Sequence, residues 1–141
     1  MKSARVRITT TLPGKPEIVF GALTHPKEIK RWSGQKGKME MKAGGKFEMF
    51  DGWVKGRVVQ FDPAKSLVHT WRPADWPEEA AESVVKYTFR RTKKGTKVVL
   101  IHSDFPNETE RKSHENGWKE FVIDPLKEYL STRTQARSEA E

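Results

Sequence analysis

Hydrophobic and polar residues alternate along several short segments, which is the pattern of β-strands with one buried face. In the first segment, 4–12, Val6 and Ile8 fall on one side and Arg5 and Arg7 on the other. Six further segments are expected to be strands: 38–41, 46–50, 53–61, 66–72, 83–92 and 96–103. The turns between these six segments are mostly of hairpin length, so the strands are predicted to form an antiparallel meander.

Two short helices are predicted between the first strand and the second. Pro16 opens the helix 17–23, because proline is well tolerated in a first helical turn. Thr24 is expected to cap the second helix, 26–31, which brings Trp32 to its end.

The hydrophobic spacing changes to three and four residues from Asn107 to Leu130, which predicts one long amphipathic helix. Asn107 is a good N-cap, and Glu110 three residues later completes a capping box. Six residues are expected on the apolar face: Trp118, Phe121, Val122, Leu126, Tyr129 and Leu130. Pro125 removes one helical hydrogen bond, so a bend is expected near Val122, with Gly117 as a second weak point.

These elements predict an α+β protein in which a curved antiparallel sheet of six to seven strands wraps around the long C-terminal helix. Residues 1–131 are expected to form a single domain, and the polar residues 132–141 a disordered tail. A glycine within the strand 53–61, Gly56, is expected to mark a bulge or a bend.

The charge is unevenly distributed. The chain has 27 Lys and Arg against 19 Asp and Glu; residues 1–104 hold 21 basic and 11 acidic residues, and residues 105–141 hold 6 and 8. This asymmetry is consistent with solubility and sheet–helix complementarity, or with an acidic protein partner. Nucleic acid is not expected to be a partner, because no basic run is interleaved with aromatic residues.

The sequence contains no cysteine, and this is consistent with a reducing, cytoplasmic location. The first residues lack the apolar core of a signal peptide, and no apolar run is long enough for a membrane span.

The order of motifs resembles the START-like, or SRPBCC, superfamily with its helix-grip fold, and within it the group named after the activator of heat-shock protein 90 ATPase. The matching residues are Pro16, Val19, Phe20, Trp32, 44–47, 56–58, Leu67, Trp71, Trp76, Pro77, 83–89, 95–98, 114–118, 125–126 and 129–130. The resemblance covers about residues 4–130 and implies either an apolar ligand held in a cavity or a protein partner such as a chaperone. Some members of the superfamily are cyclases or dehydratases.

Fourteen aromatic residues, 10% of the chain, favour a pocket for a small apolar molecule or lipid between sheet and helix, although a solid core remains the alternative. The residues expected to line this cavity are Trp32, Phe47, Met49, His69, Trp71, Trp76, Tyr87, Trp118, Phe121 and Val122. Tyr87, His69 or a tryptophan indole nitrogen is expected to orient the ligand.

Catalysis has little support in the sequence, so no catalytic residue, cofactor or metal is expected and the protein is not expected to be an enzyme. No close metal-ligand spacing is present. Ser103 and Asp104 follow His102, but adjacent strand residues point to opposite faces and cannot form a relay. His114 lies four residues after Glu110, which predicts a surface pair on the helix.

Overall fold

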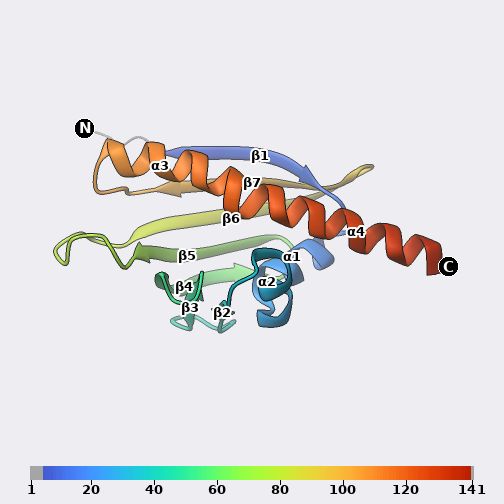
Figure 1. The fold of residues 1–141 in the computed structure, drawn as a ribbon, viewed down its shortest axis with the longest axis horizontal. Helices are drawn as coiled ribbons and strands as arrows, with labels where there is room; N and C mark the ends of the chain where they lie inside the picture. The colour runs from blue at the N-terminus through green and yellow to red at the C-terminus, as the bar shows by residue number, and fades with distance from the viewer. Residues whose placement is uncertain (1–4, 141) are drawn as a thin grey trace.

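A seven-stranded antiparallel sheet is the framework of the molecule (Figure 1). The computed structural model describes residues 5–140, with side chains through Arg133. The strands are β1 (Val6–Leu12), β2 (Lys38–Met39), β3 (Lys46–Met49), β4 (Val54–Asp62), β5 (Ser66–Pro73), β6 (Ser83–Thr92) and β7 (Gly95–Ser103). Their order in the sheet is β1-β7-β6-β5-β4-β3-β2, so the first strand crosses over to pair with the last. The predicted α+β class and antiparallel sheet are confirmed.

Alternating burial along the strands follows the sequence pattern. In β6, Val85, Tyr87 and Phe89 are buried while the residues between them are exposed. Gly56 does not form the expected bulge, because the register shift in β4 lies between Val58 and Gln60. A Cβ at Gly56 would lie 2.2 Å from the Thr70 carbonyl oxygen, so this glycine permits close approach of two backbones.

The two short helices are α1 (Pro16–Thr24) and α2 (Pro26–Ser33), both beginning at a proline. Trp32 donates its indole N–H to the Ala22 carbonyl at 2.8 Å, which fixes the corner between them. Thr24 does not cap α2 as expected. Its hydroxyl bonds the Phe20 carbonyl inside α1, and the N-cap position of α2 is His25, without a side-chain cap bond.

The long helix crosses the sheet as three consecutive segments: α3 (Glu108–Trp118), the π-helical turn η1 (Lys119–Ile123) and α4 (Asp124–Ala140) (Figure 1). Asn107 caps it as predicted, because its side chain accepts from the Glu110 backbone N–H at 2.9 Å. The helix does not break at Gly117. Instead, the irregularity lies at η1, where the Asp124 N–H bonds the Lys119 carbonyl five residues earlier.

Pro125 explains this wider turn. A proline at that position cannot donate to the carbonyl of Phe121, and its ring would press on that carbonyl in a regular α-helix. A π turn relieves the clash by inserting one extra residue. The insertion also corrects the predicted apolar face: Val122 and Ile123 are both buried, whereas Phe121 is turned outward and is 56% exposed.

Beyond Leu130 the backbone is helical to Ala140. The disordered tail expected for 132–141 stays a prediction, and its last residue lies outside the described part of the chain. Residues such as Arg, Gln and Ala extend a helix that is already nucleated with little penalty.

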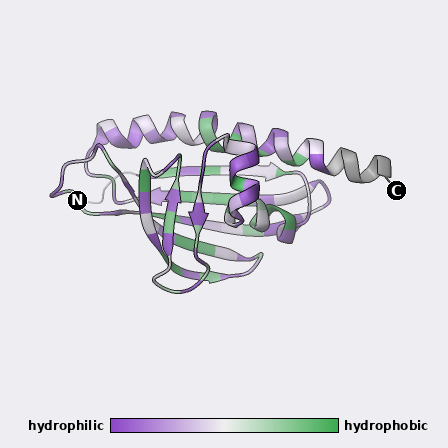
Figure 2. Ribbon diagram, turned by 60° about the horizontal axis from the view of Figure 1, so that its bottom comes forward, coloured by the Kyte–Doolittle hydropathy of each residue, from purple (hydrophilic) through white to green (hydrophobic). Residues whose placement is uncertain are grey.

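The core lies between the sheet and the long helix. Its fully buried side chains come from both layers, including Leu67 and Leu100 from the sheet and Leu126 and Leu130 from the helix. In Figure 2, hydrophobic residues recur along the strands, and hydrophilic residues predominate on α2. The helix therefore covers one face of a curved sheet, which is the helix-grip arrangement.

Candidate functional site

The turn between β3 and β4 forms one side of the candidate site. Phe50, Asp51 and Gly52 all have positive φ, at 54°, 57° and 88°, and this conformation is strained for the two residues other than glycine. Asp51 anchors the turn, because its Oδ1 accepts from the Lys36 N–H at 2.7 Å and its own N–H bonds the Lys36 carbonyl at 3.0 Å. The anchored turn holds the rings of Phe50 and Trp53 edge to face, with 6.3 Å between centroids.

The long helix forms the other side. The space between the two is an apolar groove of about 270 Å³. The lining residues are Phe50, Trp53, Trp71, Ser113, His114, Gly117, Trp118, Phe121 and Val122, and we call this the apolar groove. Trp53 and Phe121 remain 42% and 56% exposed, while Trp71 and Trp118 are buried. The groove thus has two exposed rings and two buried ones.

Gly117 leaves room in the groove wall. A Cβ added there would meet no atom closer than Phe121 Cδ2 at 4.0 Å, so no close contact requires a glycine at this position. A glycine in a helix interior costs about 1 kcal/mol relative to alanine. The missing side chain keeps open the space beside the exposed Phe121 ring.

Trp71 connects the buried part of the groove to a polar network. Its indole N–H donates to His114 Nε2 at 3.1 Å, and its ring lies 4.8 Å from that of Trp118. His114 Nδ1 must then carry the proton, which it donates to the Glu110 carbonyl at 2.8 Å. His114 is therefore buried and shared between sheet and helix. The predicted pairing with Glu110 is present, with His114 Nδ1 3.7 Å from Glu110 Oε1, but the histidine is buried and not on the surface.

Glu110 also does not complete the capping box. Its Oε1 accepts the indole N–H of Trp76 at 2.8 Å instead, so the carboxylate holds the β5–β6 loop against the helix. Burial lowers the pKa of His114, and this effect outweighs the opposing influence of Glu110 and Asp75.

A second tryptophan–histidine pair lies directly beneath. Trp118 donates its indole N–H to His102 Nδ1 at 2.9 Å, so the His102 proton is on Nε2 and is donated to Ser83 Oγ at 2.7 Å. Ser83 in turn donates to the Trp71 carbonyl at 2.6 Å. Burial, reinforced by the neighbouring His114 and His69, lowers the pKa of His102 to about 2.

The Ser83–His102 contact resembles a nucleophile and its base only in distance. A general base needs a nitrogen lone pair facing the hydroxyl, and here the nitrogen facing Ser83 carries the proton. Both groups are completely buried. The pair is therefore a structural bridge between β6 and β7.

His69 belongs to a third buried contact. Its ring stacks on that of Phe47, with 4.0 Å between the ring centroids. Its Nδ1 donates to the Thr70 carbonyl at 2.9 Å, and its Nε2 lies 3.4 Å from the Tyr87 hydroxyl. Burial lowers the pKa of His69 to about 4 and raises that of Tyr87. His69 and Tyr87 are thus satisfied by each other and by the backbone.

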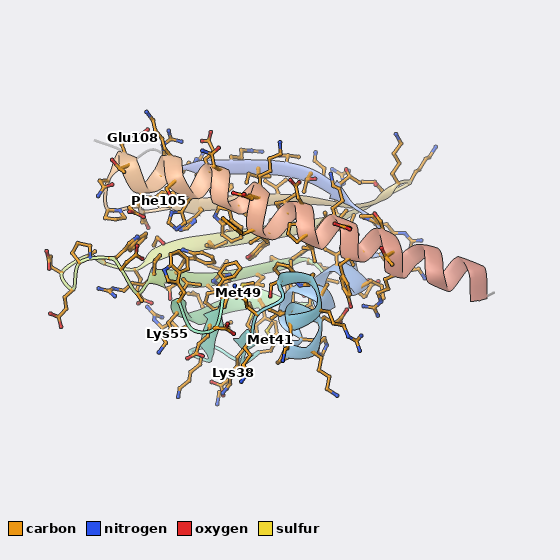
Figure 3. All side chains as sticks on the ribbon, viewed as in Figure 1. Lys38, Met41, Met49, Lys55, Phe105 and Glu108 are labelled. Atoms are coloured by element: carbon orange, nitrogen blue, oxygen red, sulfur yellow. The ribbon has the colours of Figure 1, made fainter. Side chains whose placement is uncertain are left out.

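The residues expected to line a cavity divide into two groups. Trp71, Trp118, Phe121 and Val122 line the apolar groove. The other six, Trp32, Phe47, Met49, His69, Trp76 and Tyr87, are buried in the core and do not line it. Figure 3 labels Met49, which lies below the long helix in this view, on the side of the strands β3 to β5.

Sequence reasoning missed five lining residues: Phe50, Trp53, Ser113, His114 and Gly117. The signal for two of them was present, because aromatic residues flank the Asp51-Gly52 turn on both sides. Among the described residues, no group of three or more His, Cys, Asp or Glu is placed to hold a metal ion. No helix within 5–140 is long and apolar enough to cross a membrane.

A curved antiparallel sheet gripping a long C-terminal helix, with a groove beside residues 113–122 of that helix, defines the class of helix-grip proteins. Within that class, residues 13–131 match the family model described as "Activator of Hsp90 ATPase homolog 1-like protein", and the chain belongs to this family. This confirms the resemblance seen in the sequence.

Relatives agree with the assignment. The human protein named "Activator of 90 kDa heat shock protein ATPase homolog 1" is 24% identical over 126 residues, which are 89% of this chain and 37% of that protein. The chain therefore spans little more than a third of this curated relative. A Dictyostelium discoideum homologue with a corresponding name is 32% identical over 93 residues, covering 65% of this chain and 24% of that protein.

Solved structures show the same fold. A Mesorhizobium loti protein superposes with a TM-score of 0.79 at 26% identity, covering 92% of this chain and 98% of that one. A Plasmodium falciparum protein described as an HSP90 activator superposes with a TM-score of 0.76 at 26% identity, covering 93% and 97%.

Proposed function

We propose that the chain binds a small apolar or aromatic molecule in the apolar groove. The observation that carries the proposal is the pair of exposed rings, Trp53 and Phe121, which line the groove together with the buried Trp71 and Trp118. A volume of about 270 Å³ is near the lower end for small-molecule sites. The occupant is therefore one or two rings, or a short acyl segment, rather than a large lipid.

Binding would be by burial between rings, with few polar contacts. The indole nitrogens of Trp71 and Trp118 are already bonded to histidines, and His69 and Tyr87 lie outside the groove. Within residues 5–133, neither the Ser113 hydroxyl nor the Trp53 indole N–H has a hydrogen-bond partner. These two groups are the ones available to orient a ligand.

Tryptophan fluorescence titrated with a panel of aromatic metabolites and short-chain lipids tests this proposal. We expect at least one compound to cause a saturable shift or quenching of the tryptophan emission. If the exposed Trp53 and the buried tryptophans both contribute to this change, Trp53→Phe should lose about half of it. A panel that gives no saturable change, together with unchanged methyl and aromatic NMR shifts at the groove, would refute it.

The second candidate is a contact with a chaperone of the Hsp90 type that changes its ATPase rate. The family and the names of the relatives favour it, as does the basic character of residues 1–104. Because the chain covers 37% of the human relative, the activity of that whole protein is not transferred with the fold. The test is the ATPase rate of purified Hsp90 with and without the chain, and an unchanged rate at saturating concentration excludes this candidate.

The third function considered, a cyclase- or dehydratase-like reaction, has less support. Such a reaction needs an ionisable group facing the substrate. His114 is the ionisable residue lining the groove, and its ring nitrogens are committed to Trp71 and to the Glu110 carbonyl.

A further inference from the structure

A second, much larger depression lies on the other side of the β3–β4 turn, against α2. Its volume is about 1110 Å³, and it is wide and open to solvent. It is lined by Pro26, Lys27, Lys30, Arg31, Lys36, Gly37, Lys38, Glu48, Asp51 and Gly52, and we call it the basic groove. Three of its cations come from α2, whereas Lys36 precedes β2 and Lys38 is the first residue of β2.

The five cations of the basic groove are exposed, and one of them, Lys38, lies opposite Glu48 in the pairing of β2 with β3. Within residues 5–133, none of Lys27, Lys30, Arg31, Lys36 and Lys38 takes part in an ion pair. By contrast, Glu28 of the same helix is neutralised by Arg133 and accepts the hydroxyl of Tyr129 at 2.9 Å. In Figure 3 the labelled Lys38 lies at the outer edge of the molecule, with its side chain directed outward.

The two carboxylates of the basic groove are already engaged. Asp51 accepts the backbone N–H of Lys36, and Glu48 Oε1 lies 4.0 Å from Lys55 Nζ, which is outside the groove. Since like charges left unpaired on neighbouring elements repel one another, this arrangement favours an anionic occupant over an empty groove.

The walls of the basic groove are held in place before anything binds. A Cβ at Gly37 would lie 2.5 Å from Ile29 Cγ2 and 3.3 Å from the Glu48 carbonyl, so the chain packs closely between α2 and β3 there. Asp51 and Lys36 are joined by two hydrogen bonds. A charged surface on rigid elements loses little entropy when it binds a partner.

We propose that the basic groove binds an acidic segment of a partner polypeptide, in extended conformation, with carboxylates directed to the α2 wall and to the 36–38 wall. The volume of the groove, about 1110 Å³, and the presence of cations on both of its walls suit a chain better than a single small anion. A nucleic acid is disfavoured, because no aromatic side chain among the described residues lines the groove for base stacking, whereas the carboxylates of Glu48 and Asp51 line it.

This inference deepens the second candidate function, since it names the surface and the chemistry of a protein partner, and it is independent of ligand binding in the apolar groove. Its failure is distinguishable from the failure of that candidate. If the peptide binds but the ATPase rate of the chaperone does not change, the proposal of an acidic-segment site is supported and only the chaperone function is refuted.

The experiment measures fluorescence anisotropy of a fluorescein-labelled peptide of alternating glutamate and alanine. A peptide with glutamine in place of glutamate is the uncharged control. Charge reversal by Lys30→Glu with Arg31→Glu is compared with Lys93→Glu with Lys94→Glu, which makes the same charge change at the exposed turn between β6 and β7. Lys30→Gln with Arg31→Gln serves as a milder variant if the reversal perturbs α2, and circular dichroism checks the fold of each.

The acidic peptide is expected to bind with an affinity that falls as the salt concentration increases. The charge reversal in α2 is expected to weaken this affinity about tenfold or more. The charge reversal at the turn between β6 and β7 is expected to change the affinity less than about threefold. Equal losses in both reversals would show attraction by net charge alone and overturn the proposal. Absence of binding, or tighter binding of a single-stranded oligonucleotide with the same dependence on Lys30 and Arg31, would also overturn it.

Discussion

The indole nitrogen of Trp118 donates a hydrogen bond to Nδ1 of His102 across 2.9 Å, which joins the long helix to the strand β7 in the middle of the core. Both side chains are buried, and the described residues contain no buried side-chain nitrogen or oxygen without a partner. Sheet and helix are thus joined by directional contacts as well as by apolar packing.

Removing that donor is expected to be costly. Trp118→Phe leaves His102 Nδ1 unpaired in the core, so the free energy of unfolding should fall by about 2–4 kcal/mol, from the unsatisfied acceptor and the lost packing together. Urea denaturation measures the change. The same substitution at the exposed Trp53 should cost less than about 1 kcal/mol. Equal losses at the two positions would contradict the role assigned to the hydrogen bond.

Stability should fall in mild acid. His69 and His102 have pKa values of about 4 and about 2 in the folded state, below the 6.5 of an unperturbed histidine, because burial disfavours the charged form. As pH falls below 6.5 the unfolded state takes up protons first, so each histidine removes about 1 kcal/mol per pH unit, and this contribution is fully present only above pH 6.5.

Urea denaturation between pH 7 and pH 5 checks this dependence, above the range in which most carboxylates titrate. The variant His69→Gln will be less stable at pH 7, but its stability should depend less steeply on pH by about 1 kcal/mol per unit. An unchanged slope in that variant would mean that His69 does not titrate as stated.

Substitutions at Gly117 should have different effects on the stability of the helix and on ligand binding in the apolar groove. Gly117→Ala should stabilise the protein by up to about 1 kcal/mol, since a Cβ there has open space, and should leave ligand affinity within about threefold. Gly117→Leu should fill the groove beside Phe121 and weaken any groove ligand at least about tenfold. A groove ligand that binds Gly117→Leu as tightly as the parent chain occupies some other site.

The β3–β4 turn should depend on the side chain of Asp51. Asp51→Ala loses the bond to the Lys36 N–H and places alanine at φ 57°, so a loss of about 1–3 kcal/mol is expected from thermal or urea unfolding. Asp51→Asn keeps an oxygen acceptor and tolerates positive φ, and should stay within about 1 kcal/mol of the parent. If both variants were equally stable, the turn would not be held by this contact.

Strands, the two proline-initiated helices and the Asn107 cap could be predicted because each depends on neighbouring residues. The π turn could not, since its cause is a proline acting on the carbonyl four residues earlier, and regular 3.6-residue spacing placed Phe121 on the buried face. The tryptophan–histidine pairs also escaped prediction, because Trp71 and His114 are 43 residues apart in sequence. The number of aromatic residues indicated an interior rich in aromatic rings. Which of these rings fill the core and which line a groove is shown only by their positions in the three-dimensional structure.

The turn at Phe50–Gly52 borders both grooves, since Phe50 lines the apolar groove whereas Asp51 and Gly52 line the basic groove. Thermodynamic linkage then applies to any pair of occupants. If an occupant of one groove shifts this turn and so changes affinity at the other, the second occupant must change the affinity of the first by the same factor. A turn of three residues is therefore the shared element through which any such coupling between the two grooves would pass.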